Sequence, residues 1–511
     1  MPHDENIVSL DLGTSSVRAF LFDGQFNRLE DFGAQIKYQV TTTPDGGVEI
    51  DPDVLVKIMC DCLDILHPQM KERGKKAIAV GISTFWHCFV GVDREERPTA
   101  PIIHLFDTRS QKQVRELRDR FDPAWLHSTT GCMPHTSYWP AKLMWLRETH
   151  ADAFQRTVRW LSVGEFLLLK LTGKTAESIS MVSASGLWDR HRDDYCEEIL
   201  DFVSIQRLQL APVDSLDEPV KTLQSDFAQR WPLWQNTPWY PACGDGACNN
   251  VGSGCTTQNK FALMVGTSGA IRAVAKQADP TIPYGLWCYR VNRERSILGG
   301  AVSNGGGVFG WATRTLNLPL NAEEEMIKRQ PGSHGLTVLP FFSGERSPYW
   351  RSDLRAMITG ISLSTTPVEI LQAMLESVAL RFKQIYELLK QSCGEPAEVI
   401  ASGGALMNSP VWLQMMTDAV AHPIKPCLEA EASSRGAAIL AAERMGLISG
   451  IEGVPASLGA IVQPDRERIE IYQQLLTRND QLLHTFYKDL PEPEQIAGLP
   501  SYLDGQVSIY F

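Results

Sequence analysis

Two short turns of glycine, threonine and serine stand at matching places in the two halves of the chain. Gly13-Thr14-Ser15 follows the apolar segment 7–12, and Gly266-Thr267-Ser268 follows the apolar segment 261–265. Such a turn exposes several backbone N–H groups and two hydroxyls at one point, which suits the oxygens of a phosphate. A single copy is more often ordinary turn chemistry. Two copies that face each other across a cleft can hold adjacent phosphates of one nucleotide, so the repeat favours phosphate binding.

A carboxylate accompanies the first turn only. Asp11 ends the first apolar segment, and its counterpart before the second turn is Met264. Each turn is followed by an apolar segment that contains an arginine, Arg18 in the first copy and Arg272 in the second. A buried, unpaired carboxylate is costly. Two interpretations therefore stay open: Asp11 forms a structural ion pair with Arg18, or it is a Mg²⁺ ligand, direct or through water, beside the phosphates.

An aspartate between two glycines is the candidate general base. In Cys243-Gly244-Asp245-Gly246 the neighbours of Asp245 give it little side-chain cover, so its carboxylate can approach a substrate closely. It would then accept the proton of an attacking hydroxyl and align that oxygen with a γ-phosphate. The alternative is that Asp245 only forms an Asx turn or takes a left-handed backbone conformation, as Asp-Gly commonly does.

Small residues also mark a predicted strand-to-helix turn late in the chain. Ser402 to Asn408 follows the apolar strand 399–401 and precedes a predicted helix over 410–420. Glycines at such a turn allow a flat ring, such as a nucleotide base, to lie against the backbone.

The elements that must position these residues alternate between strands and helices. The sequence predicts a hairpin over 7–12 and 17–22, a helix over 51–66 opened by Asp51-Pro52, and strands over 76–82 and 89–92. A tryptophan-rich, largely helical stretch over 123–239 is expected to decorate the first domain. Together with the repeated turn, this pattern predicts an α/β fold of two similar domains. We expect an N-terminal domain over 1–254, a C-terminal domain over 255–450, and a helical extension and tail over 451–511, with a helix near 469–487.

Composition excludes several classes of function. The 511 residues are 43% hydrophobic, and 48 basic against 60 acidic residues give a net charge of −12. A surface this acidic argues against nucleic acid or anionic lipid as the main partner. No basic, apolar leader opens the sequence, and no apolar run reaches membrane-spanning length, so a cytoplasmic protein is expected. The 11 cysteines contain no C-x-x-C pair, which favours reduced core thiols over a zinc site or disulfides.

Taken together, the motifs resemble those of the FGGY family of carbohydrate kinases, in order and in spacing. The likeness runs over residues 6–447. It is carried by Asp11-x-Gly13-Thr14-Ser15, Asp107-x-Arg109, Gly244-Asp245-Gly246, Gly266-Thr267-Ser268-Gly269 and Gly403-Gly404-Ala405-x-x-Asn408-x-x-x-Trp412. The resemblance implies two ribonuclease H-like domains of the actin and sugar-kinase superfamily, with ATP and a sugar in the cleft between them. It leaves open whether the chain is a monomer or a homodimer.

The resemblance also implies roles for individual residues. Asp245 matches the catalytic base, and Asp11 and Asp245 match carboxylates near Mg²⁺. The nucleotide would be held by Gly13, Thr14, Ser15, Arg18, Gly266, Thr267, Ser268, Gly306, Gly404 and Asn408. The sugar would be held by Trp86, His87, Asp107, Arg109 and Asp245.

The identity of the sugar is less well defined than the reaction. Phe106 stands where many members of the family have tryptophan, and Trp86 where several have methionine. The stretches 266–272 and 298–306 look most like the gluconate-kinase branch, so gluconate is the expected substrate and xylulose or another pentulose is the alternative. An anionic sugar acid needs a cation nearby, which Arg109 or His87 could supply. The alternative is that Arg109 only supports Asp107 within the protein.

Other readings of the sequence fit less well. Gly305-x-Gly307-x-x-Gly310 matches a dinucleotide fingerprint, but an acidic helical run over 323–325 stands where a second strand should end in one acid. His191-Arg192-Asp193 and Gly173-Lys174-Thr175 imitate a protein-kinase loop and a P-loop without their remaining residues. A non-catalytic sugar or nucleotide sensor on the same fold is the second hypothesis. The presence of both Asp245 and Asp11 favours the enzyme, because a binding module needs neither a base nor a metal carboxylate.

Overall fold

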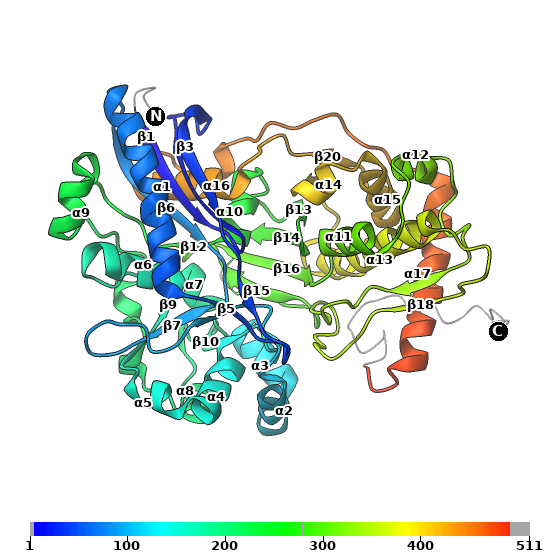
Figure 1. The fold of residues 1–511 in the computed structure, drawn as a ribbon, viewed down its shortest axis with the longest axis horizontal. Helices are drawn as coiled ribbons and strands as arrows, with labels where there is room; N and C mark the ends of the chain where they lie inside the picture. Colours follow the sequence, from blue (N-terminus) through cyan, green and yellow to red (C-terminus); the bar gives the residue numbers. More distant parts are fainter. Residues whose placement is uncertain (1–4, 278, 491–511) are drawn as a thin grey trace.

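The computed structural model describes residues 5–277 and 279–490 and consists of two lobes, each built on a β-sheet (Figure 1). The sheet of the first lobe has the order β12-β6-β1-β2-β3. Its strands are β1 (Asn6–Leu12), β2 (Ser16–Phe22), β3 (Arg28–Lys37), β6 (Ala77–Thr84) and β12 (Cys243–Gly244). β1 pairs antiparallel with β2 and parallel with β6, which confirms the predicted hairpin.

The inner strands of the first sheet are covered on both faces, which explains why β1, β2 and β6 are buried almost throughout. Helix α1 (Pro52–Glu72) packs on β2 and β3 and begins at Asp51, whose side chain accepts hydrogen bonds from the N–H groups of residues 53 and 54. Val8, Leu10 and Leu12 share a core with this helix. Ile7 and Asp11 alternate with them and therefore point to the opposite face of the sheet.

The second lobe repeats the same beginning. Its sheet has the order β15-β16-β14-β13-β19-β20, with β13 (Lys260–Val265), β14 (Gly269–Ala275), β15 (Trp287–Arg290), β16 (Ser296–Val302), β19 (Glu398–Ser402) and β20 (Ile424–Pro426). β13 and β14 form the second hairpin. Helix α13 (Pro367–Cys393), which opens with a Thr366–Glu369 capping box, packs on β14 and β16. Helices α11 (Gly306–Thr315), α12 (Ala322–Ile327), α14 (Gly404–Met407) and α15 (Pro410–Val420) and strands β17 (Thr337–Leu339) and β18 (Met357–Thr359) complete this lobe.

One helix from the end of the chain packs on the first lobe. α16 (Ala432–Arg444) crosses α10 (Asp245–Gly252) and lies on β1 and β6. The two helices touch through backbone: a Cβ at Gly252 would lie 1.8 Å from the Ala432 carbonyl oxygen, and one at Gly436 would lie 1.9 Å from that of Cys248. Glycine is therefore required at both positions. The domain boundary predicted near residue 255 falls between α10 and β13 and stays a prediction.

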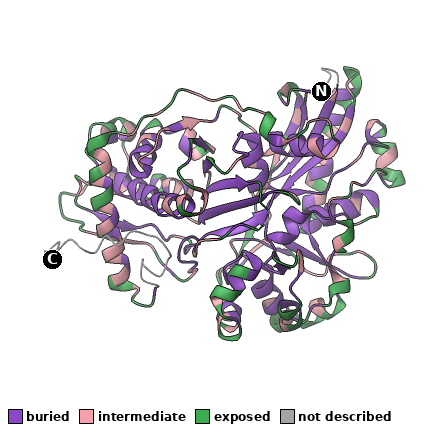
Figure 2. Cartoon of the chain, turned by 180° about the vertical axis from the view of Figure 1, so that it is seen from behind, coloured by how far each residue is buried: buried purple, intermediate pink, exposed green. Residues whose placement is uncertain are grey.

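The tryptophan-rich middle of the chain folds mainly as helices beside the first sheet. With the segment that precedes it, this region contains β7 (Phe89–Val92), β9 (Arg159–Ser162), α2 (Gln111–Arg120), α3 (Pro123–Thr130), α4 (Trp139–Thr149), α5 (Ala151–Arg156), α6 (Val163–Thr172), α7 (Ile179–Ser183), α8 (Glu197–Val203) and α9 (Ser225–Arg230). The short strands β4 (Thr41–Thr42), β5 (Val48–Ile50) and β8 (Ile102–Ile103) form a three-stranded sheet, and β10 (Trp188–Asp189) and β11 (Asp194–Tyr195) form a two-stranded sheet. Buried residues run continuously from the sheets into these helices (Figure 2).

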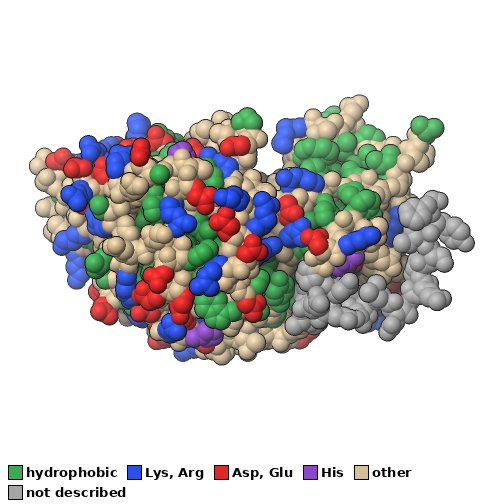
Figure 3. Space-filling view, turned by 90° about the horizontal axis from the view of Figure 1, so that it is seen from below, with side chains coloured by type: hydrophobic (Ala, Val, Ile, Leu, Met, Phe, Trp, Pro, Cys, Tyr) green, Lys and Arg blue, Asp and Glu red, His purple; other side chains and the backbone are tan. Residues whose placement is uncertain are grey.

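The last described helix, α17 (Arg466–Phe486), packs on α13, α15 and β17. Residues 491–511 of the predicted tail lie outside the described residues. On the face shown in Figure 3, acidic and basic side chains are interspersed. In the described part of the chain, no helix combines the length and the apolar character needed to cross a bilayer.

Candidate active site

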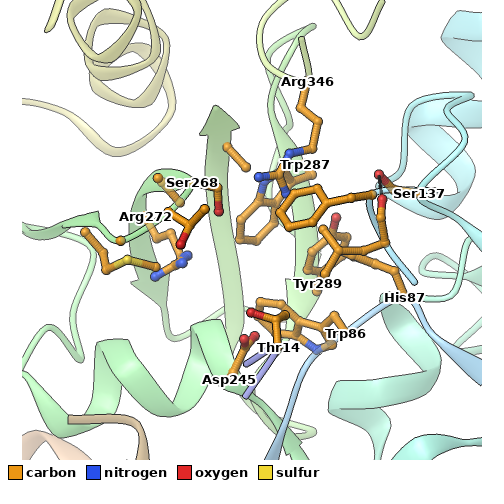
Figure 4. A pocket seen from close by; sticks show the side chains of 18 of the residues that line it. Thr14, Trp86, His87, Ser137, Asp245, Ser268, Arg272, Trp287, Tyr289 and Arg346 are labelled. Carbon is orange, nitrogen blue, oxygen red and sulfur yellow. Dashed lines mark hydrogen bonds between the residues drawn. The ribbon is translucent and has the colours of Figure 1, made fainter. Parts of the chain in front are cut away.

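A cavity of about 320 Å³ lies where the two lobes meet, and both lobes line it. The first lobe contributes Thr14 and Ser15 of the first turn, and the second contributes Gly266, Thr267 and Ser268 of the second turn. Asp245, at the start of α10, reaches the same space (Figure 4). The structure therefore brings together the two turns and the carboxylate that the sequence analysis singled out.

The first turn is fixed by its own backbone and by one tyrosine. The N–H of Gly13 donates to the Ser16 carbonyl at 2.9 Å, and the Tyr38 hydroxyl donates to the Gly13 carbonyl at 2.7 Å. Arg18 Nη1 lies 2.9 Å from Asp11 Oδ2, so the ion pair considered in the sequence analysis is present. The other oxygen of Asp11, Oδ1, is buried and has no hydrogen-bond partner among the described residues.

The second turn is held by a different device. The N–H groups of Gly306 and Gly307 donate to the carbonyls of Gly266 and Thr267, at 2.7 and 2.9 Å. A Cβ at Gly306 would lie 2.6 Å from the Gly266 oxygen and 2.5 Å from the Ala405 Cβ. These N–H groups are thus committed to the turn and are not free for the pyrophosphate of a dinucleotide.

The remaining predicted nucleotide residues stand behind this turn. Gly403 has φ +92° and packs against Val265, where a Cβ would lie 2.4 Å from the carbonyl oxygen. Gly404 begins α14, and Asn408 is the C-cap residue that follows it. With Gly306 they adjoin the second turn and lie outside the lining of the shared cavity.

Asp245 is the first residue of α10, a helix that the glycines around it did not predict. Its Oδ1 accepts a hydrogen bond from the Gly246 N–H at 2.7 Å. Gly244 and Gly246 give room to Trp86, whose indole ring a Cβ at Gly244 would meet at 1.8 Å. Burial raises the pKa of Asp245 to about 6, against the opposing effect of Arg272, and the nearby Asp11 raises it further. At neutral pH this side chain is ionised and able to accept a proton.

Trp86 and His87, two of the predicted sugar contacts, line the cavity from the first lobe together with Leu105, Phe106, Ser137 and Tyr138. The Trp86 indole N–H donates to the Ser180 carbonyl at 3.0 Å. His87 has φ +69°, and its Nδ1 lies 2.8 Å from the Ala184 carbonyl oxygen. Burial lowers the pKa of His87 to about 3. The neutral ring therefore donates from Nδ1 and presents Nε2 as an acceptor, and the expectation that His87 supplies a cation is wrong.

Asp107 and Arg109 lie outside the cavity lining. Arg109 Nη2 is 2.7 Å from Asp107 Oδ2 and 2.7 Å from Glu49 Oε1, and its guanidinium lies 4.2 Å from the centre of the Trp145 ring. Asp107 also accepts the Val48 N–H at 2.9 Å. Asp107 and Arg109 therefore bind each other, and their remaining contacts are to Glu49, Val48 and Trp145. This favours a supporting role for Arg109 within the protein.

Sequence reasoning missed most of the second-lobe wall. Tyr138 of the first lobe and several residues of the second line the cavity: Arg272, Trp287, Tyr289, Arg346 and Trp350. The hydroxyls of Tyr138 and Tyr289 are 2.6 Å apart, and the Trp287 and Tyr289 rings stack with centres 4.3 Å apart. Only Arg272 carried a signal, as the arginine of the repeated hairpin.

The donors near the first turn fit a magnesium ion. Mg²⁺ in phosphoryl-transfer sites is held by one or two carboxylates together with substrate phosphates and water. Asp11 has one buried oxygen without a partner, and its charge is close enough to affect Asp245. Among residues 5–277 and 279–490 there is no cluster of three His, Cys, Asp or Glu side chains for a metal, and such a site does not require one.

Two family models match this chain. The N-terminal domain of the FGGY family of carbohydrate kinases matches residues 6–252, and the C-terminal domain of that family matches residues 261–445. The chain belongs to the FGGY family. It is a carbohydrate kinase, and the predicted phosphotransferase class is confirmed.

Individual relatives are more distant. The chain is 24% identical to a gluconokinase of Bacillus subtilis, over 92% of this chain and 94% of that protein, and 24% identical to a xylulose kinase of Lactococcus lactis, over 95% and 97%. Crystal structures of a gluconate kinase and of a ligand-bound xylulose kinase, both from Lactobacillus acidophilus, superpose with a TM-score of 0.86, each over 94% of this chain and 98% of theirs, at 22% and 23% identity. The predicted two-domain fold of the actin and sugar-kinase type is confirmed.

Proposed function

We propose that this FGGY carbohydrate kinase transfers the γ-phosphate of ATP to a hydroxyl of a small sugar or sugar acid. The observation that carries the proposal is the position of Asp245 in one cavity with both Gly-Thr-Ser turns. A base beside two phosphate-binding turns is the arrangement that phosphoryl transfer to an alcohol requires.

Each part of the cavity has a task in this reaction. The turns hold the phosphates in line through backbone N–H groups and the hydroxyls of Thr14, Ser15, Thr267 and Ser268. Asp245 orients the attacking hydroxyl and accepts its proton. Asp11, with Asp245 nearby, would hold Mg²⁺, which when bound neutralises charge on the phosphates. Arg18 keeps Asp11 in place by pairing with its other oxygen.

ATP is proposed to bind mainly to the second lobe, against Gly306, Gly404 and Asn408, and the sugar mainly to the first, against Trp86 and His87. The neutral His87 ring suits this role, because its Nε2 accepts a hydrogen bond from a sugar hydroxyl. Approach of the lobes would exclude water and favour the sugar over water as the acceptor.

Gluconate is the preferred substrate in this proposal, and xylulose is the second candidate. Support for gluconate comes from the stretch 266–272 and from the relatives named gluconokinase; support for xylulose comes from relatives named xylulose kinase. A non-catalytic sensor is disfavoured because Asp11 and Asp245 are both present and close together.

The test is ADP release from ATP and Mg²⁺ in the presence of gluconate, xylulose, ribulose, glycerol, fuculose or rhamnulose. We expect release that depends on the sugar, with gluconate giving the highest kcat/KM. Release without any sugar sets the background. An enzyme that binds ATP and gluconate, yet releases no ADP above background with any sugar, would be the sensor.

A further inference from the structure

Two arginines in the cavity differ from all the other buried arginines of the described chain. Seven arginines are buried in residues 5–277 and 279–490. Five of them have a carboxylate within 4.0 Å: Arg190, Arg290, Arg295, Arg381 and Arg435. Arg272 and Arg346, which are 5% and 8% exposed, have none in that part of the chain. Burying an unpaired charge is expensive, so this pair requires an explanation.

Their hydrogen bonds also leave capacity unused. Arg272 makes one long side-chain contact, from Nη1 to Asn250 Oδ1 at 3.5 Å, and Arg346 donates from Nη2 to the Val302 carbonyl at 3.1 Å. The Nε–H groups of both are buried without a partner in the described structure. Both guanidiniums line the cavity.

The two charges act on one another across this space. Arg346 contributes to lowering the pKa of Arg272 to about 10, although burial is the larger cause. Arg272 thus remains protonated at neutral pH. Asp245 is the only acid in the cavity lining and pairs with neither arginine within 4.0 Å in the described residues. An anion between the two guanidiniums would satisfy both.

The position of Arg346 distinguishes a sugar carboxylate from a phosphate. Arg346 lies at the opposite end of the cavity from Asp245 and Thr14, and Arg272 and Ser268 of the second turn lie between these two ends (Figure 4). It lies over the ring of Phe106, with its guanidinium 5.9 Å from the ring centre, on the side of the cavity that His87 lines. The phosphates of ATP are already assigned to the two Gly-Thr-Ser turns in the proposed function.

We infer that Arg272 and Arg346 together bind the carboxylate of a sugar acid and make this site selective for an acid over the corresponding neutral polyol. This inference rests on the proposed kinase function. Guanidinium forks match a carboxylate through paired N–H···O bonds. A neutral substrate would leave two buried charges without a partner. Buried polar groups left unpaired in this way give strong discrimination against a close analogue.

The decisive experiment compares D-gluconate with D-sorbitol, which replaces only the carboxylate by a hydroxymethyl group. In the unmodified enzyme we expect kcat/KM for gluconate to exceed that for sorbitol by roughly 10² or more. Arg272→Gln and Arg346→Gln should each lower this ratio by roughly tenfold to 10², mainly through KM for gluconate. Arg190→Gln removes a buried arginine that pairs with Asp279 outside the cavity lining, and it should leave the ratio unchanged.

Other results would overturn the inference. If Arg272→Gln and Arg346→Gln slow both substrates equally, the arginines serve the phosphoryl group. If the unmodified enzyme uses sorbitol as well as gluconate, the site is not selective for acids, although the kinase proposal stands. If no substrate is phosphorylated, the kinase proposal fails, and calorimetric binding of gluconate against sorbitol without ATP still tests the carboxylate site.

Loss of folding is controlled by charge-conserving variants. Arg272→Lys and Arg346→Lys keep the cation and should retain a larger gluconate-to-sorbitol ratio than the glutamine variants, with thermal unfolding midpoints compared for all four. The inference would be contradicted if the lysine variants fold and bind ATP but show a gluconate-to-sorbitol ratio no larger than that of the glutamine variants.

Discussion

In the first hairpin, the arginine that follows the Gly-Thr-Ser turn stands opposite an aspartate, whereas in the second it stands opposite an alanine. Asp11 pairs with Arg18 across β1 and β2, and Ala262 pairs with Arg272 across β13 and β14. Arg18 is consequently bound to Asp11 at 2.9 Å, while Arg272 turns to the shared cavity without a carboxylate of its own. The arginine of one copy is thus paired with a carboxylate, and the arginine of the other lies at the shared cavity without one.

The two turns also differ in how tightly the surrounding residues hold them. Tyr38 holds the first turn through one hydroxyl, and a Cβ at Gly13 would have 3.4 Å to its nearest neighbour. The second turn is bonded to the backbone of Gly306 and Gly307, with no room for a Cβ at Gly306. The second turn is the more rigidly held of the two, which suits the lobe proposed to carry the nucleotide.

The largest effect is expected at Asp245, where the two turns meet. Asp245→Asn keeps the size of the side chain but removes the proton acceptor, so turnover should fall by roughly 10²–10⁴-fold while ATP binding is spared. ADP release and calorimetry measure the two quantities. Asp107→Asn, a change outside the cavity, should reduce turnover far less. Unchanged turnover in Asp245→Asn would refute its assignment as the base.

The second effect tests whether only the first turn serves the metal. Asp11→Asn should raise the Mg²⁺ concentration for half-maximal turnover by roughly 10–100-fold, because one anionic ligand is lost. Met264→Leu, at the matching place in the second hairpin, should leave it unchanged. Chelation of Mg²⁺ should stop turnover in the unmodified enzyme. An equal Mg²⁺ requirement in both variants would remove the asymmetry between the turns.

The third effect is a pH dependence of kcat/KM that Arg272 influences more than Arg18 does. The pKa of Asp245 is raised to about 6, so kcat/KM should fall about tenfold per pH unit below that value as the base becomes protonated. Arg272 favours the ionised form of Asp245, so Arg272→Gln should move the inflection to higher pH. Arg18→Gln should move it less, since Arg18 acts on Asp11. Identical profiles for both variants would contradict this division.

The smallest effect concerns how firmly each turn is held. Gly306→Ala places a Cβ against backbone and should cost about 1–3 kcal/mol of stability by overpacking, seen as a lower midpoint of thermal unfolding, and it should raise KM for ATP. Gly13→Ala meets no close contact and should leave the midpoint nearly unchanged. Equal losses in the two variants would show that the turns are held alike.

Much of this fold could be predicted from local sequence patterns. Alternation and capping indicate the first hairpin and α1, and the second Gly-Thr-Ser turn marks the beginning of the second lobe. Helix α10 was missed because its glycines read as loop residues. They serve the packing of Trp86 and of α16 instead, which are contacts between distant parts of the chain.

The candidate site was predictable where its residues lie in the repeat and unpredictable elsewhere. In the sequence, Arg346 lies between β17 and β18, and no local motif marks it as a site residue. It reaches the cavity only through the tertiary fold. Asp107 and Arg109 are close in sequence to plausible sugar contacts, but Glu49 on β5 closes an ion-pair network that holds them outside the cavity. Partners far apart in sequence decided both outcomes.

The crossing of α10 and α16 has a consequence for how the protein is made. The first lobe is complete only when α16 packs on β1, β6 and α10, and the glycines at the crossing leave no substitute for that helix. Gly252 and Ala432 are about 180 residues apart, so a ribosome adding roughly 5–20 residues per second needs about 10–40 s to deliver the second after the first. During that time the apolar face that α16 will cover is exposed on the nascent chain. A chaperone that binds apolar surface is therefore expected to associate with the first lobe until synthesis passes residue 444.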